Sequence, residues 1–152
     1  MKVLMVCLGN ICRSPIAEGI LQKQADDAGL DWTVHSAGTN FIHTGEPPHK
    51  SSQKVCKENG VDISQQRSMD FEAKHFEEYD QIYVMAEDVM NNCKKIAADR
   101  FDEKKIDYFL NELHPGSNQD VVDPWFGGED GYYQVYEQIA QCCEKIFLKF
   151  NH

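Results

Sequence analysis

The stretch that decides the fold is Cys7-Leu8-Gly9-Asn10-Ile11-Cys12-Arg13-Ser14-Pro15. It follows the apolar run Lys2–Val6, which is short, bounded by turn residues and typical of a buried strand. Ser14 and Pro15 favour a helix start, with Ser14 as N-cap and Pro15 at the first helical position. The stretch is therefore predicted to be a strand-to-helix turn, whose backbone N–H groups can converge on an anion such as phosphate.

Strand-like and helix-like segments alternate along the rest of the chain. Apolar spacing predicts helices over 14–28, 49–58, 71–79, 86–101 and 132–150, and further strands over 32–37, 81–85 and 106–110. Such alternation is typical of an α/β fold with helices on both faces of a parallel sheet. We expect one domain over residues 1–152, with a four-stranded parallel sheet in the order 2-1-3-4. Its ligand is expected beyond the carboxyl ends of the strands.

Composition and charge narrow the classes of function. The chain has 152 residues, a hydrophobic fraction of 41% and a net charge of −10. An acidic surface argues against a nucleic-acid or anionic-membrane partner. No signal peptide is apparent, and no segment approaches the ~20 apolar residues of a membrane span. The six irregularly spaced cysteines suggest reduced thiols and a cytoplasmic location.

Two side chains of the deciding stretch point to phosphoryl chemistry. Cys7 follows the predicted strand, and the field that binds an anion would also push its thiol toward the nucleophilic thiolate. Arg13 carries a planar fork that can hold two phosphoryl oxygens at once. The alternative for Cys7 is a buried structural cysteine, and the alternatives for Arg13 are an exposed surface arginine or one that caps a neighbouring loop.

The other residues of the stretch are predicted to shape the loop. A turn that directs its amides inward needs positive φ angles, which Gly9 and Asn10 tolerate best. Ser14 could cap the helix and also donate its hydroxyl to the Cys7 thiolate. Cys12 is either a small apolar filler or a resolving thiol that pairs with Cys7 under oxidation. A zinc site on the two cysteines is discounted, because it needs two more ligands nearby.

The long polar loop over 111–131 supplies a candidate acid. Asp123, followed by a proline, could protonate a leaving oxygen at the active edge. The alternative is a solvated loop acid, and Asp120 is the competing carboxylate. Phe41 and Trp125 are loop aromatics that could stack on a flat substrate ring, although anchoring of the loops is an equal alternative.

These motifs together resemble one enzyme family. Residues 6–15 closely resemble the signature of the low-molecular-weight protein tyrosine phosphatases. Asp123-Pro124-Trp125 resembles the acid loop of that family, and Ser36-Ala37-Gly38-Thr39 resembles the segment after its second strand. The resemblance runs from the first strand to the last helix. It implies hydrolysis of phosphotyrosine monoesters in phosphotyrosine-containing proteins without a metal or other cofactor, and we expect a monomer or weak dimer.

The resemblance also implies a mechanism. The Cys7 thiolate attacks phosphorus and forms a phosphocysteine, while Asp123 protonates the leaving phenolate and then activates water. Arg13 and the loop amides hold the phosphoryl oxygens. By the same resemblance Asn10 holds the shape of the loop and Ser14 steadies the thiolate. The substrate-binding candidates are Leu8, Gly9, Asn10, Ile11, Cys12, Ser14, Phe41 and Trp125.

Departures from the family pattern leave rival functions to consider. The family usually carries Asp-Pro-Tyr-Tyr, whereas Trp125-Phe126 stand here, and Gln65-Gln66 replace a family histidine. Thioredoxin-coupled arsenate reductases share the loop but need two more redox cysteines, and only Cys93 lies in that region. Protein arginine phosphatases carry threonine at the position of Ile11. A silent phosphotyrosine-binding module would need neither a nucleophile nor an acid.

Overall fold

The structure, a computed structural model, describes residues 1–124 and 128–151. The strands are β1 (Lys2–Cys7), β2 (Thr33–Gly38), β3 (Gln81–Val84) and β4 (Ile106–Tyr108). The helices are α1 (Arg13–Asp27), α2 (Lys50–Glu58), α3 (His75–Glu78), α4 (Glu87–Ala97) and α5 (Gly128–Phe150). Short 3-10 turns follow α4 at Ala98–Arg100 and β4 at Phe109–Glu112. Every predicted strand and helix is therefore present, with altered bounds.

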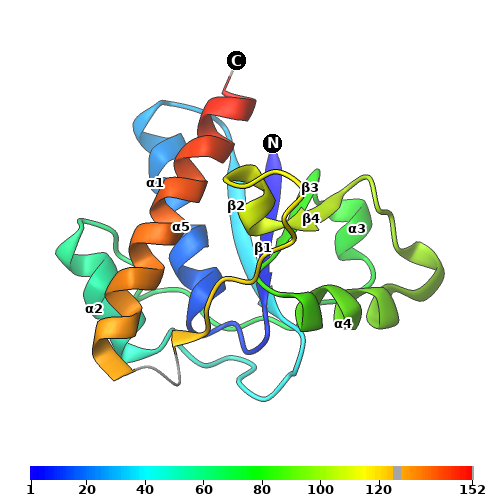
Figure 1. The fold of residues 1–152 in the computed structure, drawn as a ribbon, viewed down its shortest axis with the longest axis horizontal. Helices are drawn as coiled ribbons and strands as arrows, with labels where there is room; N and C mark the ends of the chain where they lie inside the picture. Colours follow the sequence, from blue (N-terminus) through cyan, green and yellow to red (C-terminus); the bar gives the residue numbers. More distant parts are fainter. Residues whose placement is uncertain (125–127, 152) are drawn as a thin grey trace.

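The strands form one parallel sheet in the order β2-β1-β3-β4, which confirms the predicted fold class. Figure 1 shows α1, α2 and α5 on one side of this sheet and α3 and α4 on the other. The central strand β1 pairs with both β2 and β3, and its last residue, Cys7, lies opposite Gly38. The centre of the sheet thus delivers Cys7 to the carboxyl edge.

Side chains of β1 alternate between two apolar cores. Val3 and Met5 pack with the α1, α2 and α5 side, whereas Leu4 and Val6 pack with the α3 and α4 side. All four are fully buried, as expected for a strand whose neighbours and covering helices leave no exposed face. This double burial explains why the sequence of β1 is an uninterrupted apolar run rather than an alternating one.

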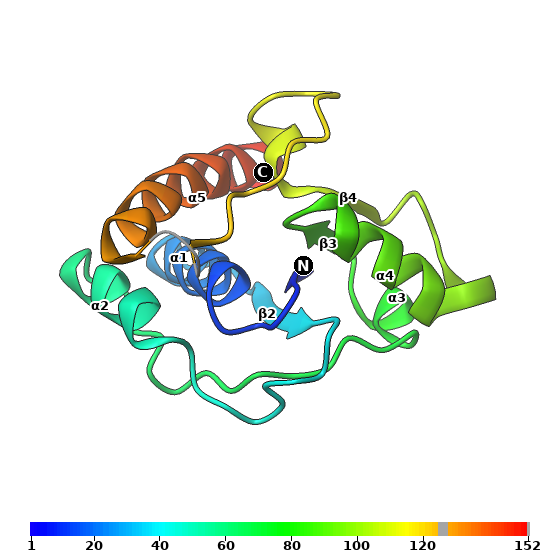
Figure 2. The same cartoon turned by 60° about the horizontal axis from the view of Figure 1, so that its bottom comes forward.

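The loops at the carboxyl edge converge over Cys7. Figure 2 brings this edge forward and shows the segments that follow β1 and β2 together with the long segment that leads to α5. The amide of Val121 donates to the carbonyl of Met85 (2.7 Å), and the amide of Gly38 donates to that of Met69 (2.8 Å). These bonds hold distant segments at the end of β1, where the ligand was expected.

The start of α1 corrects one prediction. The helix begins at Arg13, its N-cap is Cys12, and no side chain caps it. Ser14 is therefore not the N-cap, and Pro15 lies at the third helical position rather than the first. The Ser14 hydroxyl bonds to the Cys7 sulfur and to the Asn10 amide instead. At the other end of the chain, α5 begins at Gly128, so its first turn occupies residues predicted to be loop.

None of the helices in the described residues is long and apolar enough to cross a bilayer.

Candidate active site

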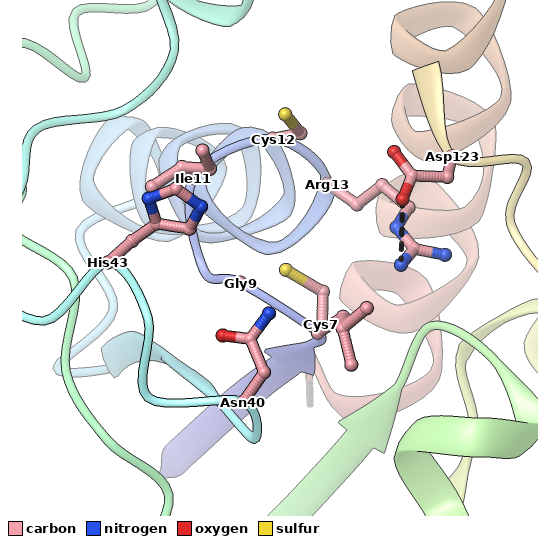
Figure 3. A pocket seen from close by; sticks show the side chains of 9 residues that line it. Cys7, Gly9, Ile11, Cys12, Arg13, Asn40, His43 and Asp123 are labelled. Atoms are coloured by element: carbon pink, nitrogen blue, oxygen red, sulfur yellow. Dashed lines mark ion pairs between the residues drawn. The ribbon is translucent and has the colours of Figure 1, made fainter. Parts of the chain in front are cut away.

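Cys7 lies at the bottom of the loop that joins β1 to α1. Its side chain is almost fully buried, and its sulfur lies 2.9 Å from the Ser14 hydroxyl oxygen. The backbone amide of Asn10 donates to the same sulfur at 3.2 Å. Figure 3 shows the sulfur pointing into the space that the loop encloses. The thiol thus faces the predicted anion site and two hydrogen-bonding groups that can stabilise a thiolate.

Asn10 holds the loop through both ends of its side-chain amide. Its Nδ2 donates to the hydroxyls of Ser14 (2.8 Å) and Ser36 (2.9 Å), and its Oδ1 accepts from the amide of Met69 (2.9 Å). Its φ of 57° confirms the predicted left-handed backbone. Gly9 was also predicted to need positive φ, and this is wrong; instead, an added Cβ there would lie 3.1 Å from the Cδ2 of His43.

Arg13 is a buried cation at the start of α1, only 5% exposed. Its Nη1 donates to the carbonyl of Val121 at 2.9 Å, and its Nη2 lies 3.8 Å from the Oδ2 of Asp123. A buried guanidinium is stable only where acceptors surround it, so this pair of contacts explains its burial. The alternative of an exposed surface arginine is excluded.

The two candidate carboxylates occupy different places. Asp123 shares a cavity with Cys7 and pairs with Arg13, and its side chain keeps 31% of its surface exposed. Asp120 accepts from the backbone amide of Glu87 at 2.9 Å, at the first residue of α4. Asp120 therefore bonds to the start of that helix, whereas Asp123 is the one of the two that shares the cavity with Cys7.

The cavity above Cys7 has a volume of about 260 Å³. Its lining comes from the β1–α1 loop, the segment after β2 and the loop before α5 (Figure 3): Cys7, Leu8, Gly9, Ile11, Cys12, Arg13, Asn40, His43 and Asp123. Asn40 and His43 were not predicted. The available signal was their position, because residues 38–48 follow β2 at the same edge of the sheet.

The predicted aromatic walls have different outcomes. Phe41 has a φ of 60° and is 49% exposed, and it does not line the cavity, although its neighbour Asn40 does. Trp125 lies outside the described residues. Phe41 therefore lies beside the cavity lining rather than in it, and the predicted roles of Phe41 and Trp125 in stacking stay predictions.

Cys12 lines the cavity while its thiol contacts the core. Its sulfur lies 3.4 Å from the Tyr132 hydroxyl, and Tyr132 stacks on His49 with ring centroids 5.2 Å apart. Burial raises the pKa of the Cys12 thiol to about 12, so this sulfur stays protonated at neutral pH. The filler interpretation fits this setting, and the disulfide with Cys7 stays a prediction.

Glu18 joins the site through a contact that the sequence did not predict. It lies on α1, half-buried, and its Oε1 accepts from the Ser36 hydroxyl at 2.5 Å. Burial raises the pKa of Glu18 to about 7 against the opposing effect of the Ser36 bond. Its place in the second turn of a helix gave no sign that it would reach β2.

Within residues 1–124 and 128–151, no group of three or more His, Cys, Asp and Glu side chains could hold a metal ion. The side chains that line the cavity include the Cys7 thiol, the Arg13 guanidinium and the Asp123 carboxyl. A nucleophile, a fixed cation and a proton carrier in one small space are the groups needed for covalent transfer of an anionic group.

Comparisons with known proteins point to one family. The family model described as low molecular weight phosphotyrosine protein phosphatase matches residues 2–152. A protein of that name from Saccharomyces cerevisiae is 35% identical over 152 residues, which span 97% of this chain and 93% of that protein. Among solved structures, Vibrio vulnificus Wzb in complex with benzylphosphonate is similar (29% identity, TM-score 0.86, 98% of each chain). A Drosophila arginine phosphatase is also similar (29% identity, TM-score 0.89, 100% of this chain and 99% of that one).

Proposed function

The chain belongs to the low molecular weight phosphotyrosine protein phosphatase family and is a protein tyrosine phosphatase, and on that premise we propose its mechanism and the roles of its residues. It hydrolyses phosphotyrosine monoesters through a phosphocysteine intermediate. The observation that carries this proposal is the cavity in which Cys7, Arg13 and Asp123 meet. Cys7 and Arg13 come from the two ends of one loop, whereas Asp123 comes from a distant segment, and each of the three supplies one group that the reaction needs.

The first step transfers the phosphoryl group to sulfur. The Cys7 thiolate attacks phosphorus, the S–P bond forms, and the bond between phosphorus and the phenolic oxygen breaks. Protonated Asp123 gives its proton to that oxygen, so tyrosine leaves as a neutral phenol. Arg13 and the amides of the β1–α1 loop hold the remaining phosphoryl oxygens and stabilise the charge that develops on them. The buried bond from Arg13 to Val121 supports this role, because it fixes the guanidinium before substrate arrives.

The second step releases phosphate. Asp123, now a carboxylate, takes a proton from water, and the resulting hydroxide attacks phosphorus. The S–P bond breaks with its electron pair on sulfur, inorganic phosphate leaves, and the enzyme is left with its Cys7 thiolate restored and Asp123 protonated again. The Ser14 hydroxyl, 2.9 Å from the sulfur, supports departure of the sulfur by donating to it. The partial exposure of Asp123 fits this step, since the carboxylate must reach a solvent molecule.

A flat aromatic ring fits the rim of the cavity. Leu8 and Ile11 line its wall, and Phe41, Ile42 and Val122 expose apolar surface in the flanking loops. We assign Phe41 to the rim, and the stacking of Trp125 on the substrate ring is proposed from the sequence alone. The other candidates for substrate contact are the loop residues Leu8, Gly9, Asn10, Ile11, Cys12 and Ser14.

A second candidate function is hydrolysis of phosphoarginine. It is favoured by the similarity to the Drosophila arginine phosphatase. The family pattern opposes it, because arginine phosphatases carry threonine where Ile11 lines this cavity. We therefore place phosphotyrosine first. We also propose that residues 1–152 form one domain that acts in the cytoplasm on phosphotyrosine-containing proteins, as a monomer or weak dimer; its six unpaired cysteines support a reducing compartment.

An activity screen tests the proposed function. Wild-type protein and the Cys7→Ser variant are assayed on a phosphotyrosine peptide, phosphoarginine, arsenate and p-nitrophenyl phosphate. We expect turnover of the phosphotyrosine peptide and p-nitrophenyl phosphate, with both activities lost in Cys7→Ser. Circular dichroism of the variant serves as the control for folding. Faster turnover of phosphoarginine than of phosphotyrosine would reverse the order of the two candidates, and activity that survives in Cys7→Ser would reject the nucleophile.

A further inference from the structure

A continuous set of hydrogen bonds connects the Cys7 sulfur to the carboxyl of Glu18. It runs from the sulfur to the Ser14 hydroxyl (2.9 Å), from there to the Asn10 amide (2.8 Å) and on to the Ser36 hydroxyl (2.9 Å). The last bond joins Ser36 to Glu18 (2.5 Å). Ser14, Asn10 and Ser36 are all buried, so their hydrogens turn toward one another rather than toward solvent.

When Cys7 is a thiolate, the donor and the acceptor of every bond in this set are determined. A thiolate has no hydrogen, so Ser14 must donate to it. The Ser14 oxygen can then accept from Asn10, whose Nδ2 carries two hydrogens and donates the other to Ser36. The single hydrogen of the Ser36 hydroxyl goes to Glu18, which is an acceptor at both oxygens when ionised. The donors therefore diverge from the Asn10 amide: one branch ends on the Cys7 sulfur, and the other ends on the Glu18 carboxylate.

We propose that Glu18 is a positioning residue of this phosphatase: its carboxylate fixes the Ser36 hydroxyl, which through Asn10 directs the Ser14 hydroxyl onto the Cys7 sulfur. This inference rests on the proposed function for its effect on turnover. It assigns to Glu18 no contact with substrate. Its effect on the sulfur itself exists whether or not a phosphoester is present.

The setting of Glu18 makes this effect dependent on pH. Burial raises its pKa to about 7, so the carboxylate forms over the neutral range rather than far below it. Glu18 also borders a cavity of about 410 Å³ whose charged lining is Lys23, Asp26 and Asp27 from α1 and Asp62 from the segment after α2. The charge of Glu18 also acts on Tyr79, whose hydroxyl bonds to His35 of β2. When Glu18 is protonated, it can donate to Ser36 as well as accept from it, so the carboxyl no longer fixes the direction of the Ser36 hydroxyl hydrogen.

Two substitutions at Glu18 separate positioning from packing. Glu18→Leu removes the acceptor but keeps the volume, and Glu18→Gln keeps an acceptor oxygen without the charge. Asp26→Asn is the matched control, because Asp26 lies on the same helix and borders the same cavity while its Oδ1 accepts from Gln22 rather than from Ser36. For each variant, kcat and KM for p-nitrophenyl phosphate are measured from pH 6 to pH 8, together with Tm.

We expect Glu18→Leu to lower kcat about fivefold at pH 8, the scale of one net hydrogen bond, with KM within about twofold of wild type. Its Tm at pH 8 should not fall, because the substitution removes a half-buried carboxyl whose ionised form is disfavoured by burial. Glu18→Gln should match wild type at pH 6, where Glu18 is protonated, and fall below it at pH 8. Taking the ratio of wild type to Glu18→Gln cancels the titration of every other group. Asp26→Asn should match wild type throughout.

Alkylation of Cys7 by iodoacetamide supplies a readout that needs no phosphoester. The rate at pH 8, followed by peptide mass spectrometry, reports the reactivity of the thiolate. A slower rate in Glu18→Leu than in wild type supports the inference even if wild type turns over no phosphoester, in which case only the proposed function fails. Wild-type kcat and alkylation rate in Glu18→Leu would overturn it. A ratio of kcat between wild type and Glu18→Gln that does not change with pH would also overturn it. The same holds if kcat falls only in variants whose Tm falls.

Discussion

At the scale of single residues, the two charged side chains of the site differ in their exposure to solvent: Arg13 is almost fully buried, whereas Asp123 is partly exposed. The side chain of Arg13 is 6% exposed and that of Asp123 is 31% exposed. A buried guanidinium keeps one orientation, which suits the proposed binding of phosphoryl oxygens, whereas the proposed general acid has to exchange protons with a leaving group and with water. The difference in exposure therefore agrees with the different roles that we propose for Arg13 and Asp123.

The assignment of the acid gives a prediction at this scale. Asp123→Ala should lower kcat for phenyl phosphate ~10²–10⁴-fold, as expected for a lost general acid and base. The loss should be smaller for p-nitrophenyl phosphate, whose leaving group needs less protonation. Asp120→Ala is the matched control, because Asp120 bonds to the start of α4 and should affect Tm more than kcat. A larger loss of kcat in Asp120→Ala than in Asp123→Ala would exchange the two roles.

The backbone conformation of single residues could be predicted from the sequence better than the partners of their side chains. The positive φ of Asn10 was predicted because asparagine tolerates that backbone, and the structure confirms it. Ser14 was assigned to a helix cap because capping rules consider neighbours along the chain. Its hydroxyl instead serves Cys7, seven positions earlier. A side chain with two possible partners cannot be assigned from sequence until the fold decides which partner is nearer.

At the scale of elements, the end of β2 supports the phosphate-binding loop. Gly38 lies opposite Cys7 in the sheet. A Cβ on Gly38 would lie 3.0 Å from the backbone carbon of Gly9 and 3.0 Å from the carbonyl oxygen of Leu8. Both are backbone atoms, which cannot rotate away as a flexible side chain can. The close approach of the two segments therefore depends on the missing side chain.

Gly38→Ala tests this support. The added methyl group should destabilise the fold by ~1–3 kcal/mol and raise KM for p-nitrophenyl phosphate, because the loop must move away. Gly131→Ala is the control: its Cβ would have only ordinary contacts, the nearest 3.9 Å from Pro124, and alanine favours the helix by about 1 kcal/mol. Urea denaturation and steady-state kinetics measure both effects. Unchanged stability and KM in Gly38→Ala would contradict the account of β2.

The elements themselves could be predicted from the sequence, and their ends less well. The apolar run of β1 and the helical stripe of α5 were recognised because periodicity reports burial directly. The helix expected over 71–79 is reduced to α3, where His75 and Phe76 are buried but few neighbouring positions repeat the pattern. Short elements carry too few residues for a period to be read, and tertiary contacts set their bounds.

At the scale of the whole molecule, the site depends on contacts that no local pattern announces. The bond from Arg13 to Val121 spans 108 positions, and the bond from Asn10 to Ser36 spans 26. The parallel topology predicted that these segments share one edge of the sheet, which is why Asp123 could be placed near Cys7. The individual partners, Glu18 among them, depend on side-chain packing that topology does not determine.

The raised pKa of Glu18 also predicts how the free energy of unfolding depends on pH. Its pKa rises from an ordinary 4.5 to about 7 on folding, so the folded protein holds this proton more tightly. The resulting stabilisation is complete below about pH 4.5 and is lost as the pH rises through about 7, by up to about 3 kcal/mol. Relative to wild type, Glu18→Gln should therefore be more stable at pH 8 and equal at pH 4.5.

Urea denaturation of both proteins at pH 4.5, 6, 7 and 8 measures this difference. The exposed Asp26→Asn substitution is the control, and its difference from wild type should not follow the same course. A free-energy difference between wild type and Glu18→Gln that stays constant over the range would show that the carboxyl titrates alike in the folded and unfolded chain.

The central claim is that sulfur carries the phosphoryl group, and trapping tests it most directly. Asp123→Ala should accumulate the intermediate from p-nitrophenyl phosphate, because the substitution removes the base that activates water while the leaving group departs readily. After a rapid quench, peptide mass spectrometry should find one phosphoryl group on Cys7, and none on residue 7 of a Cys7→Ala/Asp123→Ala double variant, which has no side chain there that can carry it. A protein that releases p-nitrophenol while Cys7 never carries phosphorus would contradict the account.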